Sequence, residues 1–218
     1  MRFRNRSEAG RLLAEKLHSY AGRSDVLVLA LPRGGVPVGF EVASALHIPL
    51  DVFLVRKLGL PGHEELAMGA IATGGIRVLN QEVMEEFQIS EELIETVAAQ
   101  EQIELQRREQ AYRGDRPPPL IKGRTIILVD DGIATGSTMH AAVAALRKQD
   151  PSGIVVAVPT AASSAREEFR DEVEEFIVVK TPESFVAVGQ WYEDFSQTTD
   201  AEVTALLQRI ADTKWAGG

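Results

Sequence analysis

The sequence predicts an α/β fold in which an open, mostly parallel twisted sheet is flanked by helices. Five apolar runs lack polar alternation, which is typical of strands buried on both faces of such a sheet. They span residues 26–31, 52–55, 125–129, 154–158 and 176–179. Helical patterns lie between these runs, and alternation of strand and helix favours a parallel sheet. The 218 residues are enough for one large domain with a core of its own.

Helical spacing of apolar residues predicts the helices that cover this sheet. The last of them should begin after a Thr199-Asp200 cap, because a hydroxyl or carboxylate there can accept a hydrogen bond from a free backbone N–H. The expected segments are about 6–20, 38–46, 139–146, 163–170 and the C-terminal stretch from residue 200.

Two segments interrupt the alternation of strand and helix. Residues 67–79 are expected to form a hairpin whose turn is Thr73-Gly74-Gly75. The stretch 90–113 is rich in Glu, Gln, Ala and Leu, and it predicts a long, solvated helix on the surface. Residues 116–119 (RPPP) end that helix and form a short stiff linker to the next strand.

Charge and composition limit the function. The net charge of −9, from 23 Lys and Arg against 32 Asp and Glu, argues against a nucleic-acid partner. Residues 82–109 alone contribute −7, so the rest of the chain is nearly neutral and can form basic pockets for a small anion. The lack of Cys excludes disulfides, thiolate metal sites and cysteine nucleophiles. No apolar run reaches the ~20 residues of a membrane span, so we expect a cytoplasmic protein without a membrane partner.

The end of the run 125–129 carries the main candidate site. Ligands of parallel sheets bind at the carboxyl ends of the strands, and here Asp130 and Asp131 precede a turn of small residues that ends at Thr138. The N–H groups and hydroxyls of that turn suit a phosphate, while the carboxylates can accept hydrogen bonds from hydroxyls or hold Mg²⁺ through water. This combination fits a sugar phosphate. The alternatives are acids that only cap a strand end and a helix, or a receiver-type phosphoacceptor domain.

The segment from Ile127 to Thr138 (ILVDDGIATGST) resembles the 5-phosphoribosyl-1-pyrophosphate (PRPP) motif of type I phosphoribosyltransferases. Gly132 departs from this motif, because most members have an aliphatic residue there. Residues 31–35 (LPRGG) lie where the family has its pyrophosphate loop, and Arg56-Lys57 lie where it starts a mobile catalytic loop that would extend to residue 65. The resemblance covers about residues 26–179.

The resemblance implies a phosphoribosyltransferase-like core at about 23–180, with 90–113 as an inserted helix and a hood built from 1–22, 67–79 and 181–218. It implies an enzyme, a pentosyltransferase that moves the phosphoribosyl group of PRPP to a nitrogenous acceptor such as a nucleobase and releases pyrophosphate. Mg²⁺ is the implied cofactor, held mainly by PRPP and at most through water by the two acids. Members of the family are often dimers, so a homodimer is a further expectation.

Each matching residue takes a role from the family. Asp130 and Asp131 would hold the ribose hydroxyls and help to place the metal. The leaving pyrophosphate would be bound by Arg33, Gly34 and Gly35, because glycines allow close approach of the backbone and an arginine can bind it with two hydrogen bonds. Arg56 and Lys57 would stabilise its charge. The 5-phosphate would bind the turn formed by Ala134, Thr135, Gly136, Ser137 and Thr138.

The acceptor is less well defined by the resemblance. Members that use 6-oxopurines usually have an Asp at the position of Ala134, so hypoxanthine, guanine and xanthine are less expected here. Contact of His63 or Glu64 with the substrate is left open. Two other functions are weighed as well: a PRPP-sensing regulator without turnover, and a PRPP-dependent hydrolase on a similar sheet. The aromatic residues that could stack on a base, or instead pack the C-terminal helix onto the sheet, are Phe185, Trp191, Tyr192 and Phe195.

Overall fold

The computed structural model describes residues 2–213, apart from the side chains of Glu64 and Glu65. Its main sheet has five strands in the order β2-β1-β6-β7-β8, and every neighbouring pair is parallel. The predicted α/β sheet is therefore confirmed. The strands are β1 (Val26–Ala30), β2 (Leu50–Val52), β6 (Thr125–Val129), β7 (Gly153–Thr160) and β8 (Glu175–Lys180).

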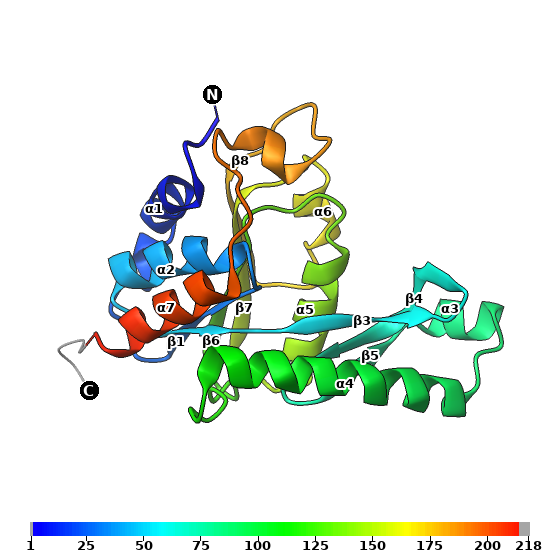
Figure 1. The fold of residues 1–218 in the computed structure, drawn as a ribbon. Helices are drawn as coiled ribbons and strands as arrows, with labels where there is room; N and C mark the ends of the chain where they lie inside the picture. Colours follow the sequence, from blue (N-terminus) through cyan, green and yellow to red (C-terminus); the bar gives the residue numbers. More distant parts are fainter. Residues whose placement is uncertain (1, 214–218) are drawn as a thin grey trace.

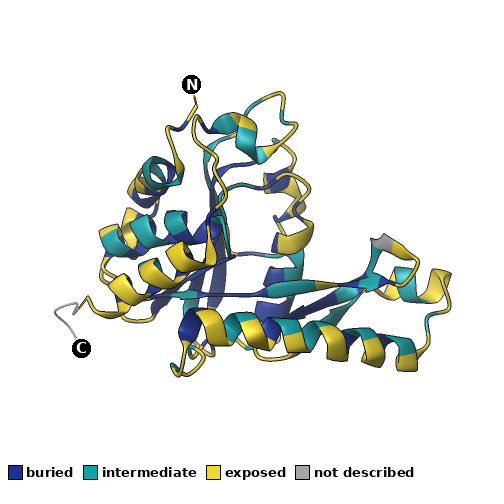
Figure 2. Ribbon diagram, in the orientation of Figure 1, coloured by how far each residue is buried: buried dark blue, intermediate teal, exposed yellow. Residues whose placement is uncertain are grey.

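Helices cover both faces of the main sheet (Figure 1). One face carries α1 (Arg6–Lys16), α2 (Gly35–Leu46) and α7 (Asp200–Ala211), and the other carries α5 (Ser137–Arg147) and the short α6 (Ala165–Glu168). Successive strand residues point to opposite faces, so Val28 belongs to the first core cluster and Leu29 to the second. Figure 2 shows the strands buried beneath helices whose outer sides are exposed.

A second unit, which we call the arm, extends away from the main sheet (Figure 1). It spans residues 55–113 and contains an antiparallel sheet with helices beside it. The hairpin predicted at 67–79 is confirmed, and Gly74 and Gly75 take positive φ angles of 83° and 72° in its turn. The arm elements are β3 (Val55–Leu60), β4 (His63–Ala72), β5 (Ile76–Leu79), α3 (Gln81–Glu86) and α4 (Glu91–Arg113).

Two predictions near the start of the arm were wrong. The single strand expected at 52–55 is divided, because β2 ends at Val52 and β3 begins at Val55 in the other sheet. Residues 58–65, expected to form a mobile loop, belong to the β3–β4 hairpin. The physical reason is the alternation of Leu58 and Leu60, which bury their side chains in the first core cluster and hold the segment as a strand.

The helix expected at 90–113 is present, with the Ser90 hydroxyl accepting from the N–H of Leu93 as its cap. It is not solvated on every side. Ile94, Ala98 and Leu105 are buried against the arm and the core. Its last turn is fixed by Arg113, which is 5% exposed and donates to the Asp51 carboxylate at 2.9 Å and to the Val52 carbonyl at 2.6 Å.

The chain ends of the described region follow the predicted pattern closely. The helix expected at 6–20 is divided into α1 and a short 3₁₀ turn, η1 (His18–Tyr20). Thr199 caps α7 in a reciprocal arrangement with Glu202, as the cap prediction requires. No helix among residues 2–213 is long and apolar enough to cross a membrane.

Candidate functional site

The acid pair lies at the carboxyl end of β6, at the centre of the main sheet. The N–H of Asp131 donates to Oδ1 of Asp130 at 2.8 Å. Nε of Arg6, at the start of α1, donates to Oδ2 of Asp131 at 2.8 Å, and both side chains are largely buried, at 11% and 13% exposed. Among the described residues, the ion pairs reach Asp131 but not Asp130.

Burial sets the charge state of this pair. It raises the pKa of Asp130 well above its usual range, and the neighbouring Asp131 carboxylate raises that pKa further. Burial also raises the pKa of Asp131, although the Arg6 guanidinium opposes the rise. Negative charge on the pair is therefore poorly stabilised by the protein alone, and hydroxyl donors or a cation as ligand would stabilise it.

The raised pKa of Asp130 predicts how the stability of the protein depends on pH. The folded chain binds the proton of the Asp130 carboxyl group more tightly than the unfolded chain does. The free energy of unfolding therefore falls as the pH rises from the ordinary pKa of an Asp, about 4, through the raised pKa of Asp130. Asp130→Asn removes this loss. We expect the variant to gain stability relative to the wild type across that window, measured by urea unfolding between pH 4 and 8. A stability difference that does not change with pH would contradict the assignment.

The segment that leads into α2 lies directly against the acid pair because it contains Gly34 and Gly35, which have no side chain. A Cβ on Gly34 would stand 2.1 Å from Oδ2 of Asp131, and a Cβ on Gly35 would stand 2.8 Å from the carbonyl oxygen of Val129. The Arg33 side chain extends toward Asp200 at the start of α7, with 3.9 Å between Nη1 and Oδ1. The predicted pyrophosphate loop is thus brought next to the acids.

The turn between β6 and α5 borders a cavity of about 180 Å³, which Asp130, the turn and Val188 line. The α5 helix begins at Ser137, so its N-terminus and the exposed Thr135, Ser137 and Thr138 lie at this cavity. Gly136 has a positive φ of 71° and packs against the His140 ring, 3.2 Å from where a Cβ would stand. N–H groups at a helix start favour an anion.

Arg56 and Lys57 directly follow the apolar run 52–55, so the sequence predicts them at the end of a main-sheet strand. This prediction is wrong, because both residues lie in β3 of the arm. Because they are consecutive strand residues, their side chains point to opposite faces. Arg56 pairs with Glu101 of α4 at 2.6 Å and lines a small cavity beside Thr138. Lys57 is exposed and lines a cavity of about 320 Å³ beside Ser137. The two cations therefore flank the turn from two sides.

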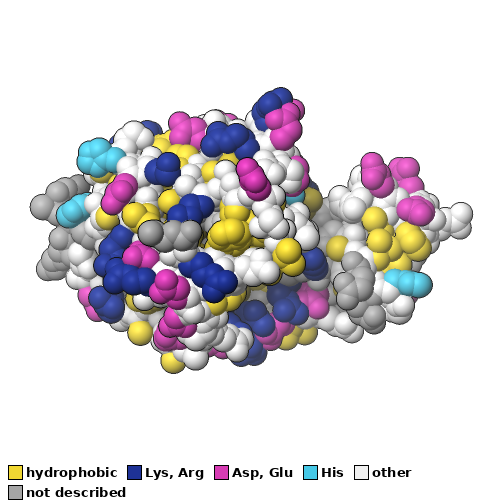
Figure 3. All heavy atoms as spheres, turned by 90° about the horizontal axis from the view of Figure 1, so that it is seen from above, with side chains coloured by type: hydrophobic (Ala, Val, Ile, Leu, Met, Phe, Trp, Pro, Cys, Tyr) yellow, Lys and Arg dark blue, Asp and Glu magenta, His cyan; other side chains and the backbone are white. Residues whose placement is uncertain are grey.

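Two segments that are far apart in the sequence cover Asp131, and we call them the cover segments: residues 3–6 and 188–196. The N–H of Phe3 donates to the Trp191 carbonyl, and the N–H of Glu193 donates to the Phe3 carbonyl, each at 2.8 Å. The Tyr192 hydroxyl donates to the Asp131 carbonyl at 2.6 Å. From above, hydrophobic side chains lie beside Lys and Arg side chains at this end of the molecule (Figure 3).

The structure resolves part of the question about the aromatic residues. Tyr192 is 3% exposed and packs on Phe3 with 5.4 Å between ring centroids, so it packs on the N-terminal segment rather than on the C-terminal helix. The Phe195 ring is partly exposed and lies 4.0 Å from the Arg6 guanidinium carbon. His63 lies in the β3–β4 hairpin with its ring 6.3 Å from that of Phe87, and the Glu64 side chain is outside the described residues.

Gly132 has a structural reason in this chain. A Cβ at this position would stand 2.6 Å from Cγ1 of Val188 and 3.1 Å from Cγ2 of Thr160. Val188, in η2 (Val188–Trp191), therefore brings an aliphatic side chain to this place. In the family that the sequence resembles, most members have the aliphatic side chain at the motif position that Gly132 occupies here.

This contact gives a prediction for stability. Gly132→Ala should lower the free energy of unfolding by about 1–3 kcal/mol through overpacking, and adding Val188→Ala should recover most of that loss. Urea unfolding of the two single variants and the double variant measures the coupling. If Gly132→Ala costs the same with and without Val188, the contact does not explain the glycine.

Arg6 and Arg108 are site residues that the sequence did not predict. Arg6 lies 125 positions before its partner Asp131 in the sequence. Arg108 is one of two adjacent arginines in an acidic helix, yet it lines the small cavity with Pro32, Arg56 and Thr138. Neither position has a local sequence signal, because both contacts depend on the tertiary fold.

Comparisons with known proteins found a matching family model, curated relatives and a similar solved structure. A family model described as a phosphoribosyl transferase domain matches residues 4–194. Proteins of two Mycobacterium tuberculosis strains, CDC 1551 and H37Rv, provisionally named phosphoribosyl transferases, are each 45% identical over 207 residues, which is 95% of this chain and 46% of theirs. This chain spans about half the length of those curated relatives. The crystal structure of TT1426 from Thermus thermophilus is 43% identical, has a TM-score of 0.85 and is matched over 96% of this chain and 99% of that one.

Proposed function

Because this chain belongs to the phosphoribosyl transferase domain family, we propose that it transfers the 5-phosphoribosyl group of PRPP to a nitrogenous acceptor and releases pyrophosphate. The observation that carries the proposal is the incompletely compensated acid pair next to a helix-start turn, with a cavity between them. These two features suit the hydroxyls and the 5-phosphate of one sugar phosphate.

The acid pair and the turn would hold the ribose end of PRPP. Asp130 and Asp131 accept hydrogen bonds from the ribose hydroxyls, which relieves the cost of burying their charge. The turn formed by residues 134–138 holds the 5-phosphate at the start of α5, where Thr135, Ser137 and Thr138 add hydroxyl donors. Binding both ends of the sugar fixes the anomeric carbon relative to the acceptor.

The leaving group would lie between the glycine loop and the arm. Gly34 and Gly35 let the loop backbone approach closely, and Arg33 adds a charge there. Arg56 and Lys57 come from β3 and flank the phosphate turn. As the C1–O bond breaks, negative charge gathers on pyrophosphate, and fixed cations nearby lower the energy of that state.

The donor set fits Mg²⁺ bound together with PRPP. Carboxylate oxygens are hard ligands, and the raised pKa of Asp130 indicates a charge that a cation would stabilise. No group of three or more Asp, Glu or His side chains among the described residues could hold a metal by itself. The ion would be held mainly by PRPP, with Asp130 and Asp131 in contact with it at most through water, and it would screen the charge of the pyrophosphate.

The acceptor in this proposal is a base or related amine that approaches under the cover segments. Ala134 offers no carboxylate where 6-oxopurine transferases usually have one, so an adenine-type or pyrimidine-type acceptor fits better. Phe195 and Trp191 supply partly exposed aromatic surface from 188–196.

Phosphorus NMR of the purified protein with Mg²⁺ and PRPP tests the proposal, first alone and then with a pool of purines, pyrimidines and simple amines. Base-dependent formation of pyrophosphate and a new phosphomonoester would support a transferase, and dividing the pool would identify the acceptor. Saturable broadening without conversion would favour a PRPP-sensing regulator. Release of pyrophosphate and ribose 5-phosphate without any base would favour a hydrolase.

A further inference from the structure

The α4 helix of the arm reaches the candidate leaving-group site. A small cavity of about 30 Å³ lies where four segments meet: Pro32 of the glycine loop, Arg56 of β3, Thr138 at the start of α5, and Arg108 of α4. Three of these segments already belong to the site. Arg108 is the contribution of α4, and nothing in the family resemblance gives it a role.

Two arginine side chains, Arg56 and Arg108, line this cavity. The Arg108 guanidinium donates through Nε to Glu104 at 2.7 Å, and its side chain is 38% exposed. An arginine has five N–H donors in a fixed fork, so one such pairing leaves donors for a ligand. Arg56 has a similar single pairing, with Glu101. Both arginines are therefore held in place by α4 acids and still face the cavity.

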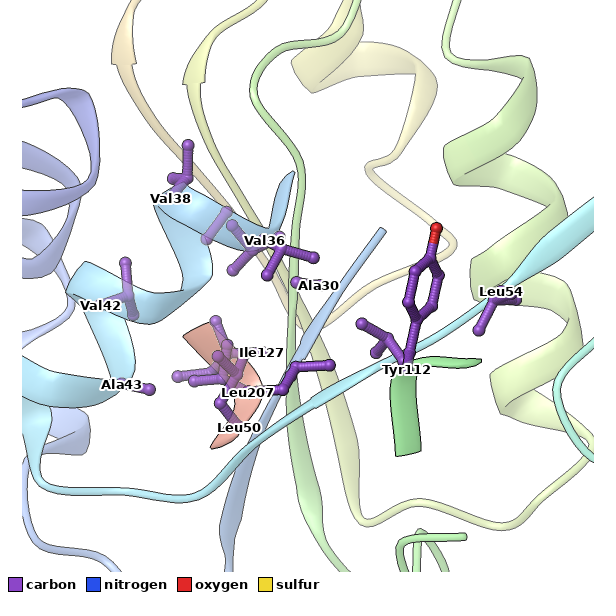
Figure 4. Close-up of a cluster of buried hydrophobic side chains, with 14 of the residues drawn as sticks. Ala30, Val36, Val38, Val42, Ala43, Leu50, Leu54, Tyr112, Ile127 and Leu207 are labelled. Atoms are coloured by element: carbon purple, nitrogen blue, oxygen red, sulfur yellow. The ribbon is translucent and has the colours of Figure 1, made fainter. Parts of the chain in front are cut away.

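Tyr112 links α4 to the carboxylate that Arg33 approaches. Figure 4 shows Tyr112, a residue of α4, among the side chains of the first core cluster. Its hydroxyl donates to Asp200 at 2.6 Å, the same carboxylate that Arg33 approaches. Burial raises the pKa of Tyr112 to about 12, and the positive charges of Arg108 and Arg33 both oppose that rise.

We propose that Arg108 binds the pyrophosphate group of PRPP, so that the arm supplies part of the leaving-group site. The assignment rests on the proposed transferase function and deepens it. When the C1–O bond breaks, the bonding electrons leave with pyrophosphate, while the acceptor nitrogen forms the C1–N bond and gives up its proton to water. The charge gained by pyrophosphate then faces Arg33, Arg56 and Arg108 from three different segments.

The adjacent Arg107 is a matched control. It also pairs with Glu104, at 2.7 Å, but it is 62% exposed and does not line the cavity. Arg107→Gln and Arg108→Gln thus each remove one positive charge from α4, and each removes a partner of Glu104. Only Arg108→Gln removes a donor from the cavity. Thermal unfolding of both variants shows whether either one alters the fold.

The experiment measures binding of PRPP, pyrophosphate and ribose 5-phosphate by calorimetry with Mg²⁺. Arg108→Gln should weaken PRPP and pyrophosphate binding roughly 10- to 100-fold, as the loss of a charge-assisted hydrogen bond predicts, and should leave ribose 5-phosphate binding unchanged. Arg107→Gln should leave all three unchanged. If Arg108→Gln binds PRPP and pyrophosphate as tightly as Arg107→Gln does, the role of Arg108 is wrong and the proposed transferase function is unaffected. If the wild-type protein binds no PRPP, the proposed function fails with it.

Discussion

Replacing both site acids, Asp130→Asn with Asp131→Asn, should weaken PRPP binding by roughly 100-fold or more, because two charged acceptors are lost, and should leave the fold intact. The two carboxylates lie at the end of a buried strand, and burial raises the pKa of each. An amide of the same shape fills the same space and removes the repulsion between the acids, and the amide oxygen at position 131 still accepts from Nε of Arg6. The variant therefore loses ligand affinity for a reason other than misfolding.

Calorimetric titration with PRPP and Mg²⁺ measures this effect, and circular dichroism checks the fold. Asp25→Asn is the control, since Asp25 lies next to the amino end of β1, at the edge of the sheet opposite the site, and pairs with Arg23 on the surface. Its PRPP affinity should equal that of the wild type. Wild-type affinity in the double variant would mean that the acid pair does not bind PRPP.

The largest expected effect on stability is at Arg113. Arg113→Met should lower the free energy of unfolding by about 3–5 kcal/mol, because it leaves a buried charge without its partner. Asp51 would lose the guanidinium at 2.9 Å, and the Val52 carbonyl would lose its donor at 2.6 Å. These bonds join the end of α4 to the edge strand β2, so the variant should also loosen the attachment of the arm.

Urea unfolding of three variants tests the origin of this effect. Arg107→Met removes an exposed pair on the same helix and should cost less than about 1 kcal/mol. Adding Asp51→Leu to Arg113→Met should restore much of the stability, since an apolar pair often replaces a buried ion pair without loss. If Arg113→Met is no worse than Arg107→Met, the buried pair does not anchor the helix.

The sequence was most informative where the signal is local. Continuous apolar runs predicted four of the five main-sheet strands, because a strand buried on both faces has no polar positions. The acids and the small residues of 130–138 are consecutive in the chain, so the turn that joins them also brings them together in space. A capping signal at Thr199 likewise depends only on its immediate neighbours.

Prediction was poorest where the signal is shared or distant. Gly59, Pro61 and Gly62 favour both a mobile loop and a tight hairpin turn, and the burial of Leu58 and Leu60 against the core decides between them. Arg6 reaches Asp131 only because the chain end crosses over the sheet. Contacts of this kind arise from tertiary structure.

The attachment of the cover segments to Asp131 has a thermodynamic consequence. One segment holds the Asp131 carboxylate through Arg6, and the other holds the Asp131 carbonyl through Tyr192. A ligand that takes Oδ2 of Asp131 must share or displace Arg6, and so it changes the strength of the Arg6–Asp131 ion pair. By linkage, whatever factor the ligand applies to the formation of that pair, the pair applies to the ligand's affinity. The affinity of the site for such a ligand therefore depends on residues 3–6 as well as on the acid pair.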